Sequence, residues 1–321
     1  MKKYFIVVNK MAQKSKAEVI WATIKDSLDS RNIDYFVKYT TDNLNATKIT
    51  TRFIKNLSRK DYEDYVIIAI GGNGTLVDTL NGIKNAGVYD FPLAFIPVGF
   101  DNAFAKGIGL SFDPLVALDQ ILNTTYPTYY DIGKYREVLR NKKGYFLNSF
   151  GIGMDAFITN IYNKKKKRRF FKKGFLAFLT SSIEAYFNQE AFSTTLRVSN
   201  SYQFFKRSYV VNIANHPYFE GNISLSPFAN VRDHNLDLMI IENMHFLRYL
   251  IFIFNLYFKK QIPDKKFHRF KDNQIHLIIR SLEFVQIDGE EQGSHYLDIY
   301  FTSEKYPFWF DINSVPILKR K

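Results

Sequence analysis

A glycine-rich segment, Gly71-Gly72-Asn73-Gly74-Thr75, has the composition of a phosphate-binding loop. Glycines let a phosphate approach the backbone closely, and they leave backbone N–H groups exposed as donors. The segment follows the apolar run Tyr65 to Ile70 and opens a helix expected over Thr75 to Ala86, whose N-terminus attracts anions. An ordinary strand-to-helix turn also uses glycine, but three glycines at this place favour phosphate binding.

Two carboxylates near the C-terminus, Asp288 and Glu290, could do acid–base chemistry. They follow a strand expected over Phe284 to Ile287. Phosphorylation of a hydroxyl needs a base that accepts the proton and positioned charge around the phosphoryl group. Asp-Gly is also a frequent hairpin turn, so these residues alone leave catalysis and a simple turn both open.

The elements that position the glycine loop alternate between strand and helix in the first third of the chain. This βαβαβ order predicts a parallel sheet covered on both faces, whose ligands bind beyond the carboxyl ends of the strands. The strands are expected over Tyr4–Val8, Tyr35–Tyr39, Tyr65–Ile70 and Leu93–Pro97, and the helices over Ser15–Asp29, Ala46–Leu57 and Thr75–Ala86.

From about residue 129 onward, strand-like stretches follow one another without regular helices between them. This texture predicts a mainly antiparallel second domain, interrupted by helical insertions near Phe170–Phe187 and Phe246–Phe258. The strands are expected over Tyr145–Asn148, Thr194–Val198, Ser208–Ile213, Leu236–Ile241, Gln274–Ile279, Phe284–Ile287 and Tyr296–Phe301.

Composition narrows the class of protein. The chain has 321 residues, no cysteine and a formal charge of +13. The missing cysteines exclude disulfides and thiolate chemistry and fit a reducing compartment such as the cytoplasm. No run approaches the roughly 20 apolar residues of a membrane-spanning helix, so we expect a soluble protein. The positive charge favours anionic partners: nucleic acid, an anionic membrane or phosphorylated ligands.

Four blocks in order along the chain resemble the diacylglycerol kinase catalytic family, which includes sphingosine and ceramide kinases. Gly71 to Leu76 is similar to the family's GGDGTL signature. The other blocks are Pro97 to Ala105, the stretch Asp131-Ile132-Gly133 with Phe146 to Ala156, and Asp288-Gly289-Glu290. The resemblance implies an α/β nucleotide domain with a parallel sheet and a β-sandwich lipid domain. We expect these at residues 1–128 and 129–303, with segment 304–321 returning to the first domain.

The same resemblance implies an ATP-dependent lipid kinase, with diacylglycerol converted to phosphatidic acid as the first expectation. One of Asp288 and Glu290 would be the base that accepts the hydroxyl proton. A structural Mg²⁺ would bind at Asn230, Asp233 and Asn235, because hard oxygen ligands suit that ion. The residues expected around ATP are Asn9, Thr40 (or Thr41), Gly71, Gly72, Asn73, Gly74, Thr75, Gly99 and Asn102.

The chain departs from the family on the nucleotide side. The first loop, Asn9 to Ala17, lacks the family's proline and glycines, although Lys14 could replace a phosphate contact. Asn73 replaces the aspartate of GGDGT. In the second block, Phe100 replaces the family's threonine and Ala103 its aspartate. Losing a positioned charge in such a site can cost on the order of 10²–10³ in rate.

Three functions are therefore weighed. A divergent lipid kinase, acting on diacylglycerol or a sphingoid or other lipid, would use other carboxylates, such as Asp101, Asp131, Asp288 and Glu290. A homologue with little activity would only bind nucleotide or lipid. A kinase of a soluble substrate would share the glycine loop with NAD kinases, but the Asp-Gly-Glu block argues against it.

The basic run Lys164 to Lys173 predicts where the protein meets its partner. It combines lysines, arginines and phenylalanines, and a helix beginning near Lys165 would place Phe171, Phe175 and Phe178 on one face. Such a helix suits an anionic membrane, at about 1 kcal/mol per basic residue. Nucleic acid or plain solvent could also face this run, but a lipid substrate favours peripheral membrane attachment. Homodimerisation stays open.

Overall fold

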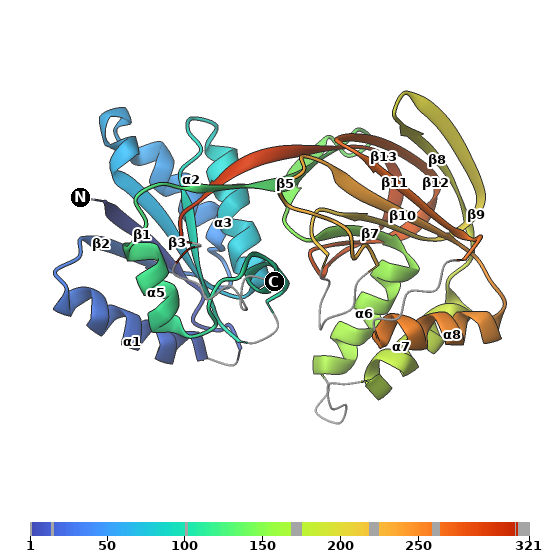
Figure 1. The fold of residues 1–321 in the computed structure, drawn as a ribbon, viewed down its shortest axis with the longest axis horizontal. Helices are drawn as coiled ribbons and strands as arrows, with labels where there is room; N and C mark the ends of the chain where they lie inside the picture. The colour runs from blue at the N-terminus through green and yellow to red at the C-terminus, as the bar shows by residue number, and fades with distance from the viewer. Residues whose placement is uncertain are drawn as a thin grey trace. The chain divides into compact units, whose positions relative to one another are not determined.

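The computed structural model describes residues 2–13, 16–99, 102–167, 175–217, 225–258, 264–311 and 313. The chain divides into two compact units (Figure 1). Unit 1 comprises Met1–Tyr130 and Lys305–Lys321, and unit 2 comprises Asp131–Glu304. Two strands carry the chain across this division: β5 (Thr128–Glu137) and β13 (Glu290–Phe308).

Unit 1 is built on a parallel sheet in the order β2-β1-β3-β4. Its strands are β1 (Lys3–Val8), β2 (Tyr35–Tyr39), β3 (Tyr65–Gly71) and β4 (Leu93–Pro97), and Phe308 of β13 pairs with Leu93. Helices cover both faces of the sheet (Figure 1). They are α1 (Lys16–Ser30), α2 (Ala46–Asn56), α3 (Asn73–Ala86), α4 (Ala103–Ile108) and α5 (Pro114–Leu122), with a 3₁₀ turn over Arg59–Asp64.

Sequence patterns account for these elements. Every residue of β3 is buried, as the strand's unbroken apolar run requires in a sheet covered on both faces. Asn45 and Asp113 cap the first turns of α2 and α5 with their side chains, and Gly87 ends α3 in the left-handed conformation. Trp21 and Leu28 of α1 are buried against the sheet, which closes the core on that face.

Unit 2 is built from antiparallel pairs. Alternate side chains of these strands form one apolar core, which includes Phe150, Leu277 and Phe301. The remaining strands are β6 (Lys142–Phe146), β7 (Ser149–Gly153), β8 (Phe192–Val198), β9 (Ser201–Ala214), β10 (Leu236–Glu242), β11 (Phe267–Asp272) and β12 (Gln274–Ile287).

Three helices of unit 2 form a second core with β9 and β10 (Figure 1). They are α6 (Met154–Lys167), α7 (Phe175–Asn188) and α8 (Phe246–Tyr257). Tyr249 and Ile253 of α8 are buried there, together with Phe178 of α7. The expected helix starting near Lys165 is wrong in its start, because Lys164 to Lys167 end a helix that begins at Met154.

The fold class is confirmed: an α/β unit with a parallel sheet and an antiparallel β unit. One expected strand is wrong. Tyr145 to Asn148 is not continuous, because β6 ends at Phe146 and β7 begins at Ser149. The backbone N–H groups at this break donate to the carboxylate of Asp288 instead of to a neighbouring strand. Helices α4, α5 and α6, and strands β5, β7 and β11, were not expected from the sequence.

Candidate active site

The residues expected around ATP gather at one edge of the parallel sheet. Asn9 follows β1, Thr40 follows β2, Gly72 follows β3 and Gly99 lies two residues after β4. Backbone hydrogen bonds tie these ends together: the N–H of Thr40 donates to Val8 at 3.0 Å, and that of Asn9 donates to Ile70 at 3.0 Å. Because all four strands run in the same direction, their carboxyl ends form a single site within unit 1.

The glycine loop is closed by a side-chain contact between two of these residues. The side-chain amide of Asn9 donates to Oγ1 of Thr75 at 3.2 Å. A Cβ on Gly71 would lie 2.4 Å from the same Oγ1, so only glycine lets Thr75 turn back onto the loop. Asn9 also accepts a hydrogen bond from the N–H of Met11 through Oδ1. This asparagine therefore links the first loop to the start of α3.

The start of α3 has the features of an anion site. Gly72 is the N-cap residue, and the first N–H groups of a helix have no partner within it. A Cβ on Gly72 would meet no heavy atom of the described residues within 4 Å, so they leave open space beside this glycine. Oδ1 of Asn73 and Nδ2 of Asn102 are buried without a hydrogen-bond partner among the described residues. The unmatched N–H donor of Asn102 fits a phosphate oxygen, whereas Oδ1 of Asn73 can only accept a hydrogen bond or ligate a cation.

Asn102 and Gly99 belong to the second block, beyond β4. Oδ1 of Asn102 accepts from the N–H of Ala105 at 3.0 Å and so caps α4. Gly99 has φ +88, and a Cβ there would lie 2.5 Å from the side chain of Gln13. The first loop thus places Gln13 against the second block. Lys14, Phe100 and Asp101, which also entered the expectations, lie outside the described residues.

The Asp-Gly-Glu block is a tight hairpin turn in unit 2. Asp288 and Gly289 both have positive φ, 51 and 84, as a two-residue type I′ turn requires, and Ile287 pairs with Glu290. The interpretation of Asp-Gly as a hairpin turn is therefore correct. It does not exclude a second role, because the side chain of Asp288 is buried and holds a distant segment in place.

The carboxylate of Asp288 accepts three backbone hydrogen bonds. The N–H of Leu147 donates to Oδ2 at 2.8 Å, and those of Asn148 and Ser149 donate to Oδ1 at 2.6 and 3.0 Å. Burial raises the pKa of Asp288 to about 6, although these hydrogen bonds lower it. Glu290, in contrast, is exposed at the start of β13. Of the two carboxylates in this block, only that of Glu290 is exposed to solvent.

A buried polar network beside this turn was not singled out from the sequence. Oδ2 of Asp155 accepts from Nδ2 of Asn212 at 2.9 Å and from Nε2 of Gln286 at 3.2 Å. Oε1 of Gln286 then accepts from the N–H of Gly289 at 2.8 Å, which connects the network to the turn. A Cβ on Gly151 would lie 1.9 Å from Oδ2 of Asp155. The spacing of Gly151, Gly153 and Asp155 was the signal that could have revealed it.

The loop expected to bind Mg²⁺ has other partners. Oδ2 of Asp233 meets Nζ of Lys271 at 2.6 Å, and Oδ1 accepts from the N–H of Asn235 at 3.0 Å. Oδ1 of Asn230 accepts from the N–H of Arg232. Within the described ranges, no three acidic or histidine side chains form a metal-binding group. In this arrangement the ammonium of Lys271 occupies the carboxylate that was expected to hold Mg²⁺, so the residues as placed do not fit a divalent cation.

The residue after Asp233 has a strained backbone. The φ of His234 is 59, in the region that glycine adopts most easily. Its backbone N–H donates to Oδ2 of the buried Asp131 at 2.6 Å. This contact stabilises the strained residue. Asp131, one of the alternative carboxylates, therefore anchors this loop.

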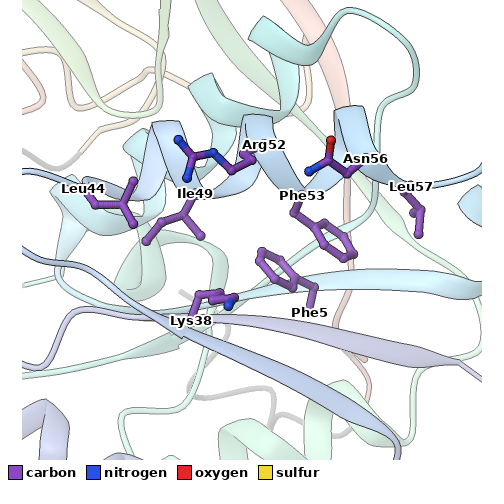
Figure 2. A pocket seen from close by; sticks show the side chains of 8 residues that line it. All are labelled: Phe5, Lys38, Leu44, Ile49, Arg52, Phe53, Asn56 and Leu57. Carbon is purple, nitrogen blue, oxygen red and sulfur yellow. The ribbon is translucent and has the colours of Figure 1, made fainter.

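A hollow of about 380 Å³ lies elsewhere on unit 1 (Figure 2). Figure 2 shows the stacked rings of Phe5 and Phe53 in it, with Arg52 and Lys38 reaching in from a helix and a strand. Its lining also includes Leu44, Ile49, Asn56 and Leu57. None of the residues expected around ATP lines this hollow, so it is not part of the candidate active site.

Comparison with known proteins assigns both parts of the chain. Residues 3–135 match the diacylglycerol kinase catalytic domain, and residues 148–302 match the YegS C-terminal NAD kinase beta sandwich-like domain. The chain belongs to the diacylglycerol kinase catalytic domain family. The glycine loop lies in its diacylglycerol kinase catalytic domain, and the Asp-Gly-Glu turn lies in its YegS-type domain.

Relatives of this diacylglycerol kinase-family chain span its length. The candidate lipid kinase YtlR of Bacillus subtilis (strain 168) is 25% identical over 92% of this chain and 95% of its own. A diacylglycerol kinase of the same organism is 25% identical over 76% of each chain. The crystal structure of a candidate diacylglycerol kinase from Bacillus anthracis str. Sterne has a TM-score of 0.73 at 22% identity, covering 96% of this chain and 97% of that one, and shows the shared fold.

These matches establish a lipid kinase of the diacylglycerol kinase and YegS type at the level of the family, whose kinases use ATP. They do not depend on any single motif, because both domains match along most of their length. Among the helices described, none is long and apolar enough to pass through a bilayer.

Proposed function

We propose that the protein is an ATP-dependent kinase of a membrane lipid hydroxyl, with diacylglycerol as the substrate and phosphatidic acid as the product. The observation that carries this proposal is the start of α3. Gly72, the N-cap residue of this helix, has open space beside it among the described residues, in a chain of the diacylglycerol kinase family. A diacylglycerol kinase of Bacillus subtilis among its relatives supports this choice of lipid.

ATP, as its Mg²⁺ salt, is the phosphoryl donor in this proposal. The N–H groups at the start of α3 and the side-chain N–H groups of Asn73 and Asn102 donate hydrogen bonds to its phosphates. This gives Nδ2 of Asn102 the partner that it lacks among the described residues. The lipid hydroxyl oxygen attacks the γ-phosphorus, the bond to the β–γ bridging oxygen breaks, and ADP leaves. Asn73 carries no charge, so it orients the phosphates by hydrogen bonds alone.

Glu290 is the base in this mechanism, and Asp288 is a positioning residue. A base must reach the hydroxyl proton, and Glu290 is exposed, whereas both oxygens of the buried Asp288 are engaged by backbone N–H groups. Glu290 accepts the hydroxyl proton as the new P–O bond forms. Asp288 fixes the turn that carries Glu290 and joins it to the segment between β6 and β7.

The protein acts at the cytoplasmic side of an anionic membrane, to which it attaches peripherally. The basic run Lys164 to Lys173 supplies the electrostatic part of this attachment. Only its beginning is described: Lys164 is exposed near the end of α6, and residues 168–174 lie outside the described ranges.

A lipid-panel assay tests the proposal. The purified protein is incubated with labelled ATP, Mg²⁺ and mixed micelles that contain diacylglycerol, ceramide, a sphingoid base or monoacylglycerol. We expect label in phosphatidic acid, and much less label when Glu290→Gln is used. Failure to label any lipid, beside an active family member as the positive control, would refute the kinase assignment.

A second function is favoured by specific residues. Asn73 and Ala103 each lack the carboxylate of the family motif, which suits a homologue that binds nucleotide or lipid with little turnover. Such a protein would show an ATP-dependent rise in melting temperature without labelled product in the same assay. Labelled lipid at a rate that Glu290→Gln abolishes would exclude it.

A further inference from the structure

Helix α8 presents a row of large apolar side chains to solvent. Leu247, Ile251, Phe254 and Phe258 are spaced by four, three and four residues, which places them on one side of the helix. Their exposed fractions range from 48 to 75%. Single exposed apolar residues are ordinary, but four in one helical row are not. We call these four residues the α8 face.

The opposite side of α8 is apolar as well. Tyr249 and Ile253 are buried against unit 2, so the helix already uses one side for the core. A helix that is hydrophobic all round normally lies inside a protein or a lipid phase. Helix α8 is not enclosed in this way within the described part of the chain, because its second apolar side is exposed. This side therefore lacks the apolar environment that its composition calls for.

Helix α7 extends the apolar surface. Figure 1 shows α7 beside α8 in unit 2, and the two helices pack together. Phe175 of α7 meets Phe254 and Phe258 with ring centroids 6.1 and 5.7 Å apart. Phe187, at the other end of α7, is 69% exposed and lies 5.2 Å from the ring of Phe246. Aromatic contacts thus join α7 and α8 near both ends of the helix pair.

The sequence that adjoins this surface is rich in basic residues, although α7 itself carries the exposed Glu184. The only charged residue of α8 is Arg248, which pairs with Asp264 at 2.5 Å. The sequence places Lys259-Lys260 directly after the α8 face and the basic run Lys164 to Lys173 directly before α7. An apolar helix face with lysines at its borders has the composition of an interfacial membrane helix, whose cations meet anionic headgroups.

We propose that the α8 face inserts into the headgroup and acyl boundary of an anionic membrane, so that attachment has an apolar component besides the basic run. This inference rests on the proposed function, because a kinase of a membrane lipid must work at a bilayer surface. The partner is the bilayer itself. A second copy of the chain would also cover apolar side chains, but it would bring together two chains whose sequences next to this face are both basic.

Vesicle binding tests the inference. The double variant Ile251→Glu/Phe254→Glu places two charges in the α8 face without touching its buried side. The matched control is Tyr202→Glu/Phe204→Glu, whose residues are exposed by 67 and 60% on β9, away from α8. With vesicles of phosphatidylglycerol and phosphatidylcholine, we expect the α8 variant to bind at least about tenfold more weakly and the control to bind like the wild type.

Insertion has its own optical readout. Phe254→Trp adds an exposed indole, whereas Trp21 and Trp309 are buried in unit 1. Vesicles that contain brominated acyl chains should quench the added fluorescence of Phe254→Trp when the protein binds. Binding without quenching of this added signal would show attachment by charge alone and would overturn the inference.

A short-chain diacylglycerol that stays dissolved separates this inference from the kinase assignment. The α8 variant should phosphorylate it at the wild-type rate while losing activity on vesicles. If no variant phosphorylates any lipid but the α8 variant alone loses vesicle binding, the kinase assignment fails and the membrane face stands. Equal vesicle binding by the α8 variant and the wild type would overturn the proposal that the α8 face inserts into the membrane. The inference would also be overturned if the wild type were a dimer in solution and the α8 variant a monomer.

Discussion

Asp288 accepts a hydrogen bond from the backbone N–H of Asn148 at 2.6 Å, although the two residues lie 140 positions apart. The contact joins the Asp-Gly-Glu turn to the break between β6 and β7. It also buries a carboxylate, and burial raises the pKa of Asp288 to about 6. The stability of unit 2 should therefore depend on pH through this residue.

The first prediction concerns that dependence. Because the pKa of Asp288 is higher in the folded state, its protonated form adds stability that is fully present below about pH 4 and is lost as the pH rises through 6. Asp288→Asn removes this titration. The unfolding free energy of the wild type relative to the variant should fall by about 2 kcal/mol between pH 4 and 7.

Urea unfolding at a series of pH values measures this difference. Asp298→Asn is the control, since it changes an acid on the same hairpin whose partner is His276. A constant difference between the wild type and Asp288→Asn across the range would show that Asp288 has an ordinary pKa.

The second prediction concerns Gly72 and ATP. In Gly72→Ala the new Cβ meets no protein atom and φ is −88, so the fold should tolerate it with less than about 1 kcal/mol of loss. If phosphates occupy the open space, the methyl group displaces them, and the KM for ATP should rise about tenfold or more. Thermal melting and steady-state kinetics measure the two effects. An unchanged KM would show that the phosphates of ATP do not bind beside Gly72.

The third prediction concerns Gly151. A Cβ there would lie 1.9 Å from Oδ2 of Asp155 and 2.5 Å from Nε2 of Gln286, so Gly151→Ala should break the buried network. We expect a loss of about 2–4 kcal/mol, because buried polar groups would lose their partners. Gly293→Ala, where a Cβ meets nothing but φ is +81, shows the cost of backbone strain alone. Equal losses in the two variants would contradict this account.

The fourth prediction separates the two carboxylates of the turn. Glu290→Gln should lower kcat by about 10²–10⁴ while leaving the melting temperature unchanged, because Glu290 is exposed and acts as the base. The rate is measured with diacylglycerol micelles. Glu291→Gln, a change at the next position, is the control. If Glu290→Gln keeps the full rate, another group must accept the hydroxyl proton.

The fifth prediction concerns the missing aspartate of the glycine loop. Asn73→Asp restores a carboxylate at the first position of α3, where the helix N-terminus stabilises it. We expect kcat to rise by on the order of tenfold, since a charge that can orient Mg²⁺ returns to the site. Asn45→Asp, at the N-cap of α2, is the control. No gain would favour a homologue that binds nucleotide without turnover.

Much of unit 1 could be read directly from the sequence. The strand Tyr65–Gly71 is an unbroken apolar run, and β2 was expected at its observed bounds, because local pattern decides such elements. The order of strands and helices also placed Asn9, Thr40, Gly72 and Gly99 at one edge of the sheet. Parallel strands share that edge whatever the details of packing.

Other features were decided by contacts between distant residues. The chain breaks at Leu147 and Asn148 because Asp288 takes their N–H groups, and no local pattern contains that information. Likewise, Lys271 meets Asp233 because β11 pairs with β10, so the loop expected to bind Mg²⁺ has an ammonium against its carboxylate. Sequence spacing could name Asp233 as a ligand but could not reveal its partner.

From its sequence the chain could be assigned to its family and its class of fold, and the loop at Gly72 was predicted to bind phosphate, because glycine placement and apolar period act locally. Contacts between distant segments make Asp288 buried and leave Glu290 exposed, although both belong to one turn. They also leave one side of the apolar helix α8 in solvent. Burial depends on what the rest of the chain brings alongside, which no single segment specifies.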